Sequence, residues 1–475
     1  MRQNLISVGI DIGTSTTQLV FSRLTVENLA SDYAVPRISI VNKEIVYKSA
    51  IAFTPLCSAS EIDGARVQEI IAREYYNAGI SPEEVSTGAV IITGETARKH
   101  NSNQVIENLS KFAGNFVVTT AGPALESALS GRGAGADVMS KELGAILVNI
   151  DVGGGTSNIS VFDRGSLKAV TCLDIGGRLV KVDREAGIIT YVYEKIKKLA
   201  QCVGITIIEG DKADEGKLRR ICGVMADVIF ATVGVCEKPA LDVDMFTGRC
   251  GPLTDIDSHL CVSFSGGVAD CIYQDGGADP FLYGDIGVML GQEIKRHVSL
   301  NKLRLCKSRE TIRATVIGAG MHTMEISGST IFYTHDNSPV KDVAILKVPD
   351  EKLNDASEFI RDRLELYMDD GVPNAVAIAF KGGEYTSFEH IQKLAQQIIS
   401  GAEAIIAGSN PLIIVVEQDI AKALGHAIDF RLNHAKGIIC IDGIETLDGD
   451  YIDIGEPIAG RSAVPVIVKT LIFNA

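Results

Sequence analysis

The sequence predicts an α/β protein in which one combination of strand, acidic residue and glycine-rich turn occurs twice. Short runs rich in valine and isoleucine, such as residues 145–151, 314–318 and 412–417, are typical of buried strands. Amphipathic helix patterns lie between these runs, and such alternation favours mixed or parallel sheets. The repeated combination, at residues 8–21 and 148–162, predicts a duplicated fold with a ligand between the two copies.

Composition and charge narrow the class of protein. The chain has 475 residues and a net charge of −15, which makes nucleic acid and anionic membranes unsuitable as main partners. None of the ten cysteines lies in a CxxC pair, so we expect reduced thiols in a cytoplasmic protein rather than disulfides or a zinc site. No signal-peptide core is present, and no apolar stretch approaches the roughly 18 residues that span a membrane.

Helix patterns and one polar seam divide the chain. Residues 61–79 predict an amphipathic helix that ends at Gly79, and residues 179–200 and 386–402 predict further helices. The residues expected to share the apolar face of the first of these helices are Ile62, Ala65, Ile70 and Tyr76. A polar, basic stretch at 297–312 marks a boundary. The expected division is a first lobe at 1–147, a second lobe at 148–297 and a C-terminal α/β region at 298–475.

In each copy of the repeat an aspartate stands near the end of the first strand. These are Asp11 in "GIDIGTSTT" and Asp151 in "NIDVGGGTSN". The turn that follows leads into a second strand, which makes a β-hairpin with a tight tip. Backbone N–H groups at such a tip converge on an anion, and glycines let phosphate oxygens approach closely. The residues expected to bind phosphate are Gly13, Thr14, Ser15, Thr16, Gly153, Gly154, Gly155 and Thr156.

Two such hairpins that face each other would hold a triphosphate from both sides. Mg²⁺ prefers oxygen ligands and keeps most of its waters, so Asp11 and Asp151 beside a phosphate are sufficient protein ligands. A metal also compensates the cost of burying Asp11 in an apolar strand. The P-loop pattern and the dinucleotide pattern GxGxxG are both absent from these turns. The predicted ligand is therefore ATP with Mg²⁺.

A third glycine turn completes the predicted site. Residues 261–270 predict a strand that ends in Ser265, Gly266 and Gly267, where an adenine ring can lie against the backbone. Residues 316–330 offer a competing adenosine turn. We prefer the first segment because its distance from the second hairpin suits one subdomain, but the sequence leaves the choice open.

These elements resemble those of the superfamily that contains actin, heat-shock chaperones and sugar kinases. That superfamily has two phosphate hairpins, an adenosine turn and two connecting helices in a set order. The corresponding segments here are 9–18, 121–131, 149–162, 263–270 and 283–294. The resemblance implies an actin-like ATPase with two duplicated RNase H-like lobes around a nucleotide cleft, plus the additional C-terminal α/β region.

Across almost the whole chain the sequence is similar to the reactivating factors of ethanolamine ammonia-lyase. The similar segments include "GAVIITGETARK" (88–99), "AGPALES" (121–127), "LDIGGRL" (173–179), "PLIIVVEQDIAKALG" (411–425) and "GDYIDIGEPI" (449–458). The resemblance implies an ATP- and Mg²⁺-dependent chaperone that exchanges damaged cobalamin for intact adenosylcobalamin in the lyase holoenzyme, its partner. It leaves a homo-oligomer and association with a bacterial microcompartment open.

By motif position, the resemblance also assigns roles to single residues. Asp11 would hold the Mg²⁺ shell, and Asp151 would orient the attacking water or a metal-bound water, so both count as catalytic and metal-binding candidates. The segment 265–267 would contact the nucleoside, and the two phosphate turns would contact the β- and γ-phosphates from opposite lobes.

Two departures from the heat-shock chaperones concern hydrolysis. Those chaperones carry a glutamate directly before the proline of the first connector, whereas Gly122 precedes Pro123 here and the nearest acid is Glu126. They also carry an acid where this chain has Asn158. Both departures predict an ATPase slower than the common range of roughly 1–1000 s⁻¹.

Two other functions stay open on the sequence alone. A small-molecule kinase needs a base at the acceptor hydroxyl, and no acid beyond those assigned to the metal is convincing. A filament-forming scaffold of the actin type needs a self-complementary surface. The region after 298 lies outside the minimal ATPase, so it is either the surface that contacts the lyase or a further α/β layer on the core.

Overall fold

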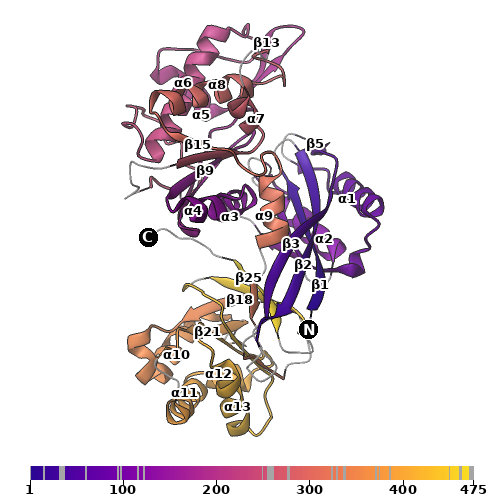
Figure 1. Ribbon diagram of the computed structural model, residues 1–475, viewed down its shortest axis with the longest axis vertical. Coiled ribbons are helices and arrows are strands. Elements are labelled where there is room, and N and C mark those ends of the chain that lie inside the picture. The colour runs from indigo at the N-terminus through magenta and orange to yellow at the C-terminus, as the bar shows by residue number, and fades with distance from the viewer. Residues whose placement is uncertain are drawn as a thin grey trace.

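The computed structural model shows three bodies (Figure 1): a first lobe at the N-terminus, a second lobe and a C-terminal region. Thr14 and Ser15, both predicted to bind phosphate, lie outside the described residues, and so does Gly122. The structure describes residues 2–13, 16–30, 38–58, 61–93, 96, 99–114, 117–120, 123–248, 250–253, 261–274, 279–322, 325–327, 330–334, 339–369, 372–373, 375–383, 387–448, 450–458 and 463–469.

The first lobe is built on a mixed sheet in the order β3-β2-β1-β7-β8. β2 is antiparallel to both β1 and β3, whereas β7 runs parallel to β1 and β8 runs parallel to β7. The strands are β1 (Arg2–Ile12), β2 (Thr16–Asn28), β3 (Ile38–Lys48), β7 (Val85–Ile92) and β8 (Val117–Thr120), with β4 (Ala52–Phe53) paired to β2 and a short hairpin of β5 (Leu56–Ser58) and β6 (Glu61–Ile62).

Helices α1 (Gly64–Ala78) and α2 (Ser102–Ala113) contribute with this sheet to one apolar core. α1 begins after Asp63, whose side chain accepts the N–H of Arg66, and ends at Gly79, which has a φ of 66°. The predicted helix and its end are confirmed. A one-turn 3-10 helix, η1 (Pro82–Glu84), leads into β7.

The predicted apolar face of α1 is wrong. Tyr76 is 87% exposed, whereas Val67, Ile71 and Tyr75 are buried against the sheet. Ile62 is buried, but it lies in β6 before the helix begins. The residues that pack against the sheet are thus the neighbours of the predicted ones: Ile71 in place of Ile70, and Tyr75 in place of Tyr76.

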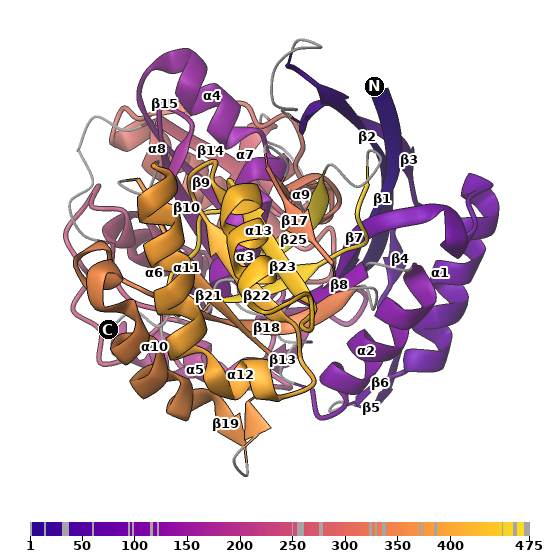
Figure 2. The ribbon, with the colours of Figure 1, turned by 90° about the horizontal axis from the view of Figure 1, so that it is seen from below.

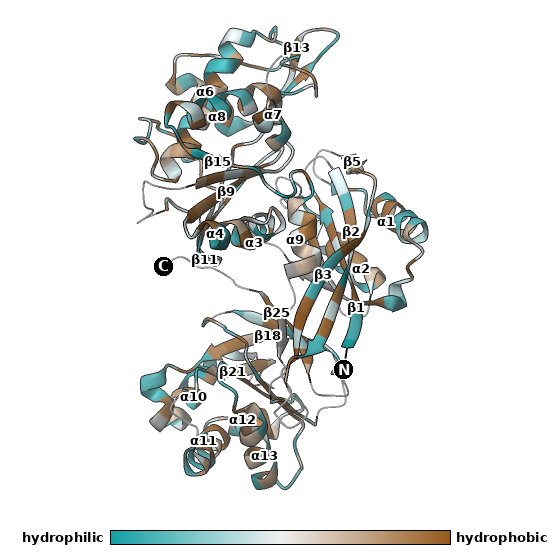
Figure 3. Ribbon diagram, viewed as in Figure 1, coloured by the Kyte–Doolittle hydropathy of each residue, from teal (hydrophilic) through white to brown (hydrophobic). Residues whose placement is uncertain are grey.

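The second lobe repeats the sheet of the first. Its order is β11-β10-β9-β14-β15, again with two antiparallel pairs at one side and two parallel pairs at the other. The repetition confirms the predicted duplicated RNase H-like lobes of an actin-like fold. Strand β9 is hydrophobic along most of its length (Figure 3). The strands are β9 (Ile146–Val152), β10 (Ser157–Asp163), β11 (Ser166–Leu173), β14 (Cys261–Ser265) and β15 (Arg304–Cys306).

A helical layer and a hairpin complete the second lobe. Residues 179–200, predicted as one helix, form the hairpin of β12 and β13 before α5 begins, so that prediction is wrong for most of its length. The cause is a turn in which Asp183 accepts the N–H groups of Glu185 and Ala186, and Gly187 has a φ of 64°. The elements are α4 (Ala136–Leu143), β12 (Val180–Asp183), β13 (Ile188–Val192), α5 (Glu194–Cys202), α6 (Glu215–Thr232), α7 (Ala269–Tyr273) and α8 (Gly287–Leu300).

Two helices cross between the lobes (Figure 1). α3 (Pro123–Gly133) follows β8 of the first lobe but packs on β10 and β11, and α9 (Ala314–His322) follows β15 of the second lobe but packs on β1 and β2. The helices also pack on each other through glycines. A Cβ on Gly133 would lie 1.8 Å from the carbonyl oxygen of Ala314, and one on Gly318 would lie 2.0 Å from that of Leu129.

The positions of α8 and α9 show that two predictions were wrong. Residues 283–294, the predicted second connector, lead into α8, which packs on α6 and α7 inside the second lobe, so α9 is the second connector instead. Residues 314–318 were predicted to form a strand and lie in α9. A short apolar run cannot be assigned to strand or helix by its pattern alone, and close packing on α3 decides for the helix here.

The domain boundaries at 147 and 297 stay a proposal. β9 begins at Ile146, close to the first boundary. The second sheet, however, continues beyond 297 to β15, and α9 packs on the first sheet. Residues shortly after 297 therefore contribute to both lobes.

The C-terminal region has its own sheet, in the order β16-β25-β24-β18-β21-β22-β23-β17. β18, β21, β22 and β23 are parallel, and Figure 2 shows α11 and α13 in front of them. The strands are β16 (Glu325–Ser327), β17 (Phe332–Tyr333), β18 (Val340–Lys347), β21 (Val376–Phe380), β22 (Leu412–Val416), β23 (Ile438–Asp442), β24 (Tyr451–Ile454) and β25 (Val464–Lys469). The helices are α10 (Ala356–Leu364), α11 (Phe388–Gly401), α12 (Glu403–Ala407) and α13 (Ala421–Arg431), with short elements η3 (Asp350–Asp355), η4 (Glu365–Tyr367), β19 (Met368–Asp369) and β20 (Val372–Pro373).

One apolar cluster joins the C-terminal region to the lobes. Ala463 and Ile467 of the C-terminal region pack with Leu24 of the first lobe, Leu129 of α3 and Ala319 of α9. Both crossing helices therefore share a core with the C-terminal region. No helix among the described residues combines the length and the hydropathy of a membrane-spanning segment.

Candidate functional site

The two predicted glycine turns have the same construction. The N–H of Gly13 donates to the carbonyl oxygen of Thr16 at 2.8 Å, and the N–H of Gly153 donates to that of Thr156 at 2.9 Å. Each bond closes the tip of a hairpin, β1–β2 in the first lobe and β9–β10 in the second. Backbone N–H groups at glycine-rich tips of this kind can bind an anion such as phosphate.

The two aspartates occupy equivalent positions just before these tips. Asp11 lies opposite Gln18 in the β1–β2 ladder, and Asp151 lies opposite Asn158 in the β9–β10 ladder. Both are buried, with 8% and 5% of their surface exposed. A hydroxyl from the neighbouring parallel strand or its end reaches each aspartate. Thr93 Oγ1 donates to Asp11 Oδ1 at 2.9 Å, and Ser265 Oγ donates to Asp151 Oδ2 at 2.6 Å.

Burial shifts the ionisation of both carboxyl groups. Loss of hydration raises the pKa of Asp11 to about 7; the hydrogen bond from Thr93 opposes this rise, and the charge of Asp151 adds to it. Loss of hydration also raises the pKa of Asp151 to about 6, against the hydrogen bond from Ser265. Two such acids facing one cavity are a strong site for a cation, because a cation removes the cost of ionising them.

Both turns line a single cavity of about 870 Å³ between the lobes. Of the predicted phosphate-binding residues, the described members all line it, with both aspartates and the glycines of the third turn. These residues are Asp11, Gly13, Thr16, Asp151, Gly153, Gly154, Gly155, Thr156, Gly266 and Gly267. The fold thus brings together segments that are more than 100 residues apart.

Ser265 is placed differently from the other predicted residues. It is fully buried and lies behind Asp151, to which it donates, rather than on the cavity wall. The competing segment 316–330 places its first residues in α9, whereas Ile312 and Thr315 just before it line the cavity. The adenosine turn at 263–270 stays a prediction, and its members that line the cavity are Gly266, Gly267, Val268 and Asp270.

Several cavity residues were not predicted from the sequence. Thr93 and Gln18 lie beside Asp11, whereas Arg178, Tyr283 and Asp285 come from the second lobe. Burial raises the pKa of Asp285 to about 6, and the N–H of Gly287 donates to its Oδ1 at 2.8 Å. The signal for Arg178 was present in the glycine pair of "DIGGR", which resembles the other glycine turns but has no hairpin pattern around it.

The two departures noted in the sequence meet in the cavity. Asn158 Nδ2 donates to Glu126 Oε1 at 2.7 Å, and both residues line the cavity wall. Beside this pair, Ser127 Oγ lies 2.9 Å from the carbonyl oxygen of Thr171 and 3.5 Å from Asn158 Oδ1. Glu126 therefore reaches the site from one turn inside α3.

The donor set suits Mg²⁺ only when a phosphate completes it. Within the part of the chain that the structure describes, no three histidine, cysteine or acidic side chains gather as a metal site. Asp11 and Asp151 supply two carboxylates, and Mg²⁺ takes its remaining ligands from phosphate and water. These residues fit a nucleotide-bound Mg²⁺ and do not fit a resident structural metal.

Comparison with known proteins identifies the family. The family model described as ethanolamine utilisation protein EutA matches residues 3–474. The chain belongs to this family. It is 35% identical to the ethanolamine ammonia-lyase reactivase EutA of Salmonella typhimurium over 474 residues, and 34% identical to that of Escherichia coli, with 99% of each chain covered in both cases. The resemblance stated from the sequence is confirmed.

Solved structures are similar to this chain only at low sequence identity. A Ppx/GppA family member from Aquifex aeolicus is 14% identical, with 66% of this chain and 97% of that chain covered and a TM-score of 0.39. The ethanolamine utilization protein EutJ from Carboxydothermus hydrogenoformans is 17% identical, with 66% and 89% covered and a TM-score of 0.35.

Proposed function

We propose that this chain is an ATP-dependent reactivating factor for ethanolamine ammonia-lyase and that its nucleotide carries Mg²⁺. The observation that carries the proposal is the pair of glycine turns, each with a buried aspartate, that line one cavity in a chain of the EutA family. The curated relatives at 35% and 34% identity are named ethanolamine ammonia-lyase reactivases. In this proposal the factor exchanges damaged cobalamin for intact adenosylcobalamin in the lyase holoenzyme.

Nucleotide binding is supported by the groups that face the cavity. The glycine turns around Gly13 and Gly153–Gly155 offer N–H groups and close approach to phosphate oxygens from two sides. Asp11 and Asp151 supply carboxylate oxygens for Mg²⁺, which would neutralise phosphate charge there. Gly266 and Gly267 line the cavity, and Gly267, where an added Cβ would meet nothing within 4 Å, leaves room for the nucleoside beside the backbone of the second lobe.

The crossing helices give the cavity a route to the rest of the molecule. Each lobe contributes one phosphate turn, so contacts to a terminal phosphate tie the lobes together and their loss releases them. Only contacts that differ between the ATP and ADP states can shift that equilibrium. α3 and α9 lie between the lobes, and both pack against Ala463 and Ile467. The C-terminal region would thus move with the lobes and contact the lyase.

Hydrolysis is slow in this proposal. The acid before Pro123 and the acid at position 158 are both missing, which leaves Glu126, inside the first connector, as the acid nearest to Pro123. Asn158 holds Glu126 by a hydrogen bond, so this carboxylate is fixed rather than free to follow a water. A slow step suits a factor that must keep its partner engaged while a cofactor leaves.

Recovery of lyase activity tests the proposal. Lyase holoenzyme inactivated during turnover is mixed with the purified protein, ATP, Mg²⁺ and adenosylcobalamin, and ammonia release is followed. We expect recovery with the wild-type protein and none when ATP or Mg²⁺ is omitted. Asp11→Asn should abolish recovery, because it removes one of the two carboxylates that lie just before the glycine turns and would hold Mg²⁺.

A matched aspartate provides the control. Asp163 ends β10, at the opposite end of the hairpin from Asn158, so Asp163→Asn should leave recovery unchanged. Recovery without ATP, or equal recovery with Asp11→Asn, would contradict the proposal. Stoichiometric transfer of phosphate to a small hydroxyl acceptor would favour the kinase alternative.

A further inference from the structure

Arg178 is anchored to the second glycine turn by its backbone. The N–H of Gly177 donates to the carbonyl oxygen of Gly153 at 3.0 Å, and the N–H of Arg178 donates to that of Gly154 at 2.7 Å. Gly176 lies so close that a Cβ on it would stand 2.4 Å from the carbonyl oxygen of Gly154. The Cα of Arg178 is therefore held at a set distance from the turn that is predicted to bind phosphate.

The side chain of Arg178 lines the cavity with an unsatisfied donor. Its Nε is buried and has no hydrogen-bond partner among the described residues. The nearest anion is Asp285, whose Oδ2 lies 3.8 Å from that Nε, beyond hydrogen-bond distance. Asp285 instead accepts the N–H of Gly287 at 2.8 Å. A buried guanidinium N–H without an acceptor is costly, so the site is built to receive one.

The charge of the cavity makes this arginine unusual. The described side chains that line the cavity include seven carboxylates and only two cations, Arg178 and Arg184. Arg184 donates to Asp279 at 2.8 Å, and both of those side chains are about half exposed. A polyanionic ligand in this cavity therefore meets one cation that is positioned beside a glycine turn and not already hydrogen-bonded at Nε.

We propose that the Arg178 guanidinium binds a phosphate group of the nucleotide, beside the Gly153–Gly155 turn. The inference rests on the proposed function, because it assumes a nucleotide in the cavity. A guanidinium matches phosphate geometry with two parallel N–H donors, which a lysine cannot reproduce. Arg178 thus adds a side-chain cation to a phosphate site that the sequence motifs describe only through glycines, hydroxyls and aspartates.

A ligand series separates phosphate binding from contact with the base. Binding of adenosine, ADP and ATP, each with Mg²⁺, is measured by calorimetry for the wild-type protein, Arg178→Gln and Arg178→Lys. We expect Arg178→Gln to weaken ADP and ATP by about 10- to 100-fold and to leave adenosine within about twofold. The affinity of Arg178→Lys for ADP and ATP should lie between those of the wild-type protein and Arg178→Gln, because lysine keeps the charge but loses the paired donors.

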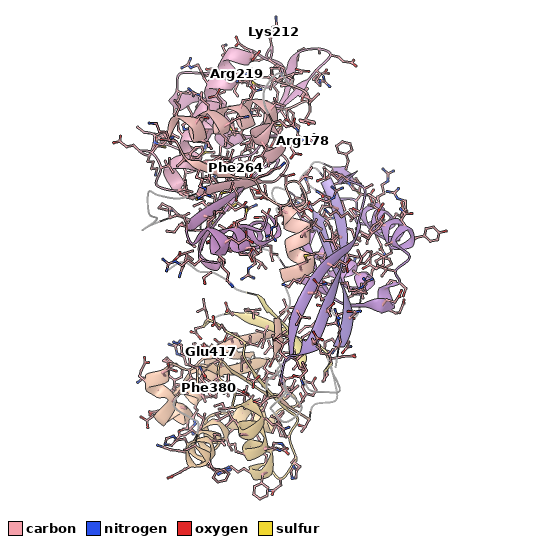
Figure 4. The ribbon with its side chains drawn as sticks, viewed as in Figure 1. Arg178, Lys212, Arg219, Phe264, Phe380 and Glu417 are labelled. Atoms are coloured by element: carbon pink, nitrogen blue, oxygen red, sulfur yellow. The ribbon has the colours of Figure 1, made fainter. Side chains whose placement is uncertain are left out.

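Arg219→Gln is the matched control. Arg219 also belongs to the second lobe and is 36% exposed, against 31% for Arg178, but it donates to Glu215 and Gln292 outside the cavity. Figure 4 labels both arginines. We expect this variant to bind all three ligands as the wild-type protein does.

The outcomes distinguish the two proposals. Wild-type protein that fails to bind ADP and ATP would overturn the proposed function and this inference together. Wild-type binding with unchanged binding by Arg178→Gln would overturn this inference alone. An equal loss for adenosine and ATP would also overturn it, because it would assign Arg178 to the base. Melting temperatures without nucleotide check folding, and if Arg178→Gln fails to fold, Arg178→Lys decides by the same criterion.

Discussion

The two glycine turns that are predicted to bind phosphate match in register but differ in the groups that hold them. Behind the first turn, the carbonyl oxygen of Gly13 accepts two side-chain hydroxyls, from Thr54 at 2.9 Å and Thr96 at 3.1 Å. Behind the second turn, the carbonyl oxygen of Gly153 accepts the backbone N–H of Gly177 at 3.0 Å. The equivalent tips are therefore supported differently: by two side chains in the first lobe, and by a neighbouring backbone segment in the second lobe.

This difference predicts unequal tolerance to substitution. In the first turn, one hydroxyl can be removed by substitution while the other still donates to the carbonyl oxygen of Gly13. A backbone segment cannot be removed, and any side chain added to it displaces the turn. We therefore expect the second turn to be the more rigid and more sensitive half of the site.

The largest expected effect is that of Gly176→Ala. The new Cβ would lie 2.4 Å from the carbonyl oxygen of Gly154, so the second turn must shift. Overpacking of this kind costs about 1–3 kcal/mol of unfolding free energy, and binding of ADP should weaken by more than about tenfold. Urea denaturation and calorimetry measure the two effects. Gly13→Ala is the matched change, because its Cβ would be 3.1 Å from the carbonyl oxygen of Thr16, and it should cost under about 1 kcal/mol. Equal costs for both variants would contradict the comparison.

The next effect concerns pH in the absence of nucleotide. The pKa of Asp11 is about 7 in the folded protein, against 3.8 for an ordinary aspartate. At pH values between these two, the folded protein therefore binds more protons than the unfolded chain. The free energy of unfolding should therefore fall as pH rises from about 4 to 7. Asp11→Asn removes the contribution of Asp11 to this fall and should stabilise the metal-free protein at pH 8 by about 1–3 kcal/mol.

Comparison of the two aspartates sharpens this prediction. The pKa of Asp151 is about 6, so the fall in unfolding free energy that Asp151 causes should be complete at a pH about one unit lower than for Asp11. Urea denaturation between pH 4.5 and 8.5 of the wild-type protein, Asp11→Asn and Asp151→Asn gives the three profiles. Identical slopes in all three would show that neither carboxyl group is held protonated by burial. Binding of Mg²⁺ with nucleotide should show the opposite trend and strengthen as pH rises, because it needs the ionised carboxylates.

The part of the site that the sequence predicted is the part that is local. Asp11 and Asp151 stand within a few residues of their glycine turns, so strand, acid and hairpin tip appear as one pattern. The duplicated sheet follows from that pattern, because each hairpin opens a lobe of the same order. Local spacing is sufficient wherever the hydrogen bonds close within one hairpin.

The residues that were missed depend on contacts between distant segments. Thr93 reaches Asp11 from the end of β7, and Arg178 reaches the second turn from a loop after β11. α9 was predicted in part as a strand, because residues 314–318 form a short apolar run, and such a run does not by itself distinguish a strand from a helix. Only the tertiary contacts with α3 and the first sheet decide its conformation.

A smaller effect is expected for the hydroxyls that hold the aspartates. Ser265→Ala and Thr93→Val each remove a donor to a carboxylate, so the Mg²⁺ concentration for half-maximal nucleotide binding should rise about tenfold. Ser265→Ala should have the larger effect, since its hydrogen bond is 2.6 Å long against 2.9 Å. Thr87→Val is the control, because the buried Thr87 hydroxyl in β7 has no hydrogen-bond partner among the described residues. An equal rise in the control would assign the effect to packing of the sheet.

The smallest effect is expected for Thr54→Val. Its hydroxyl is one of two donors to the carbonyl oxygen of Gly13, and Thr96 remains after the substitution. Loss of one such bond should cost about 0.5–1.5 kcal/mol of unfolding free energy and change ADP affinity less than about threefold. The double variant Thr54→Val with Thr96→Val should cost more than the sum of the single changes, because the partly buried carbonyl oxygen of Gly13 then loses both hydroxyl donors. Strict additivity would show that the two threonines do not share this role, and the first turn would then be as dependent on its backbone as the second.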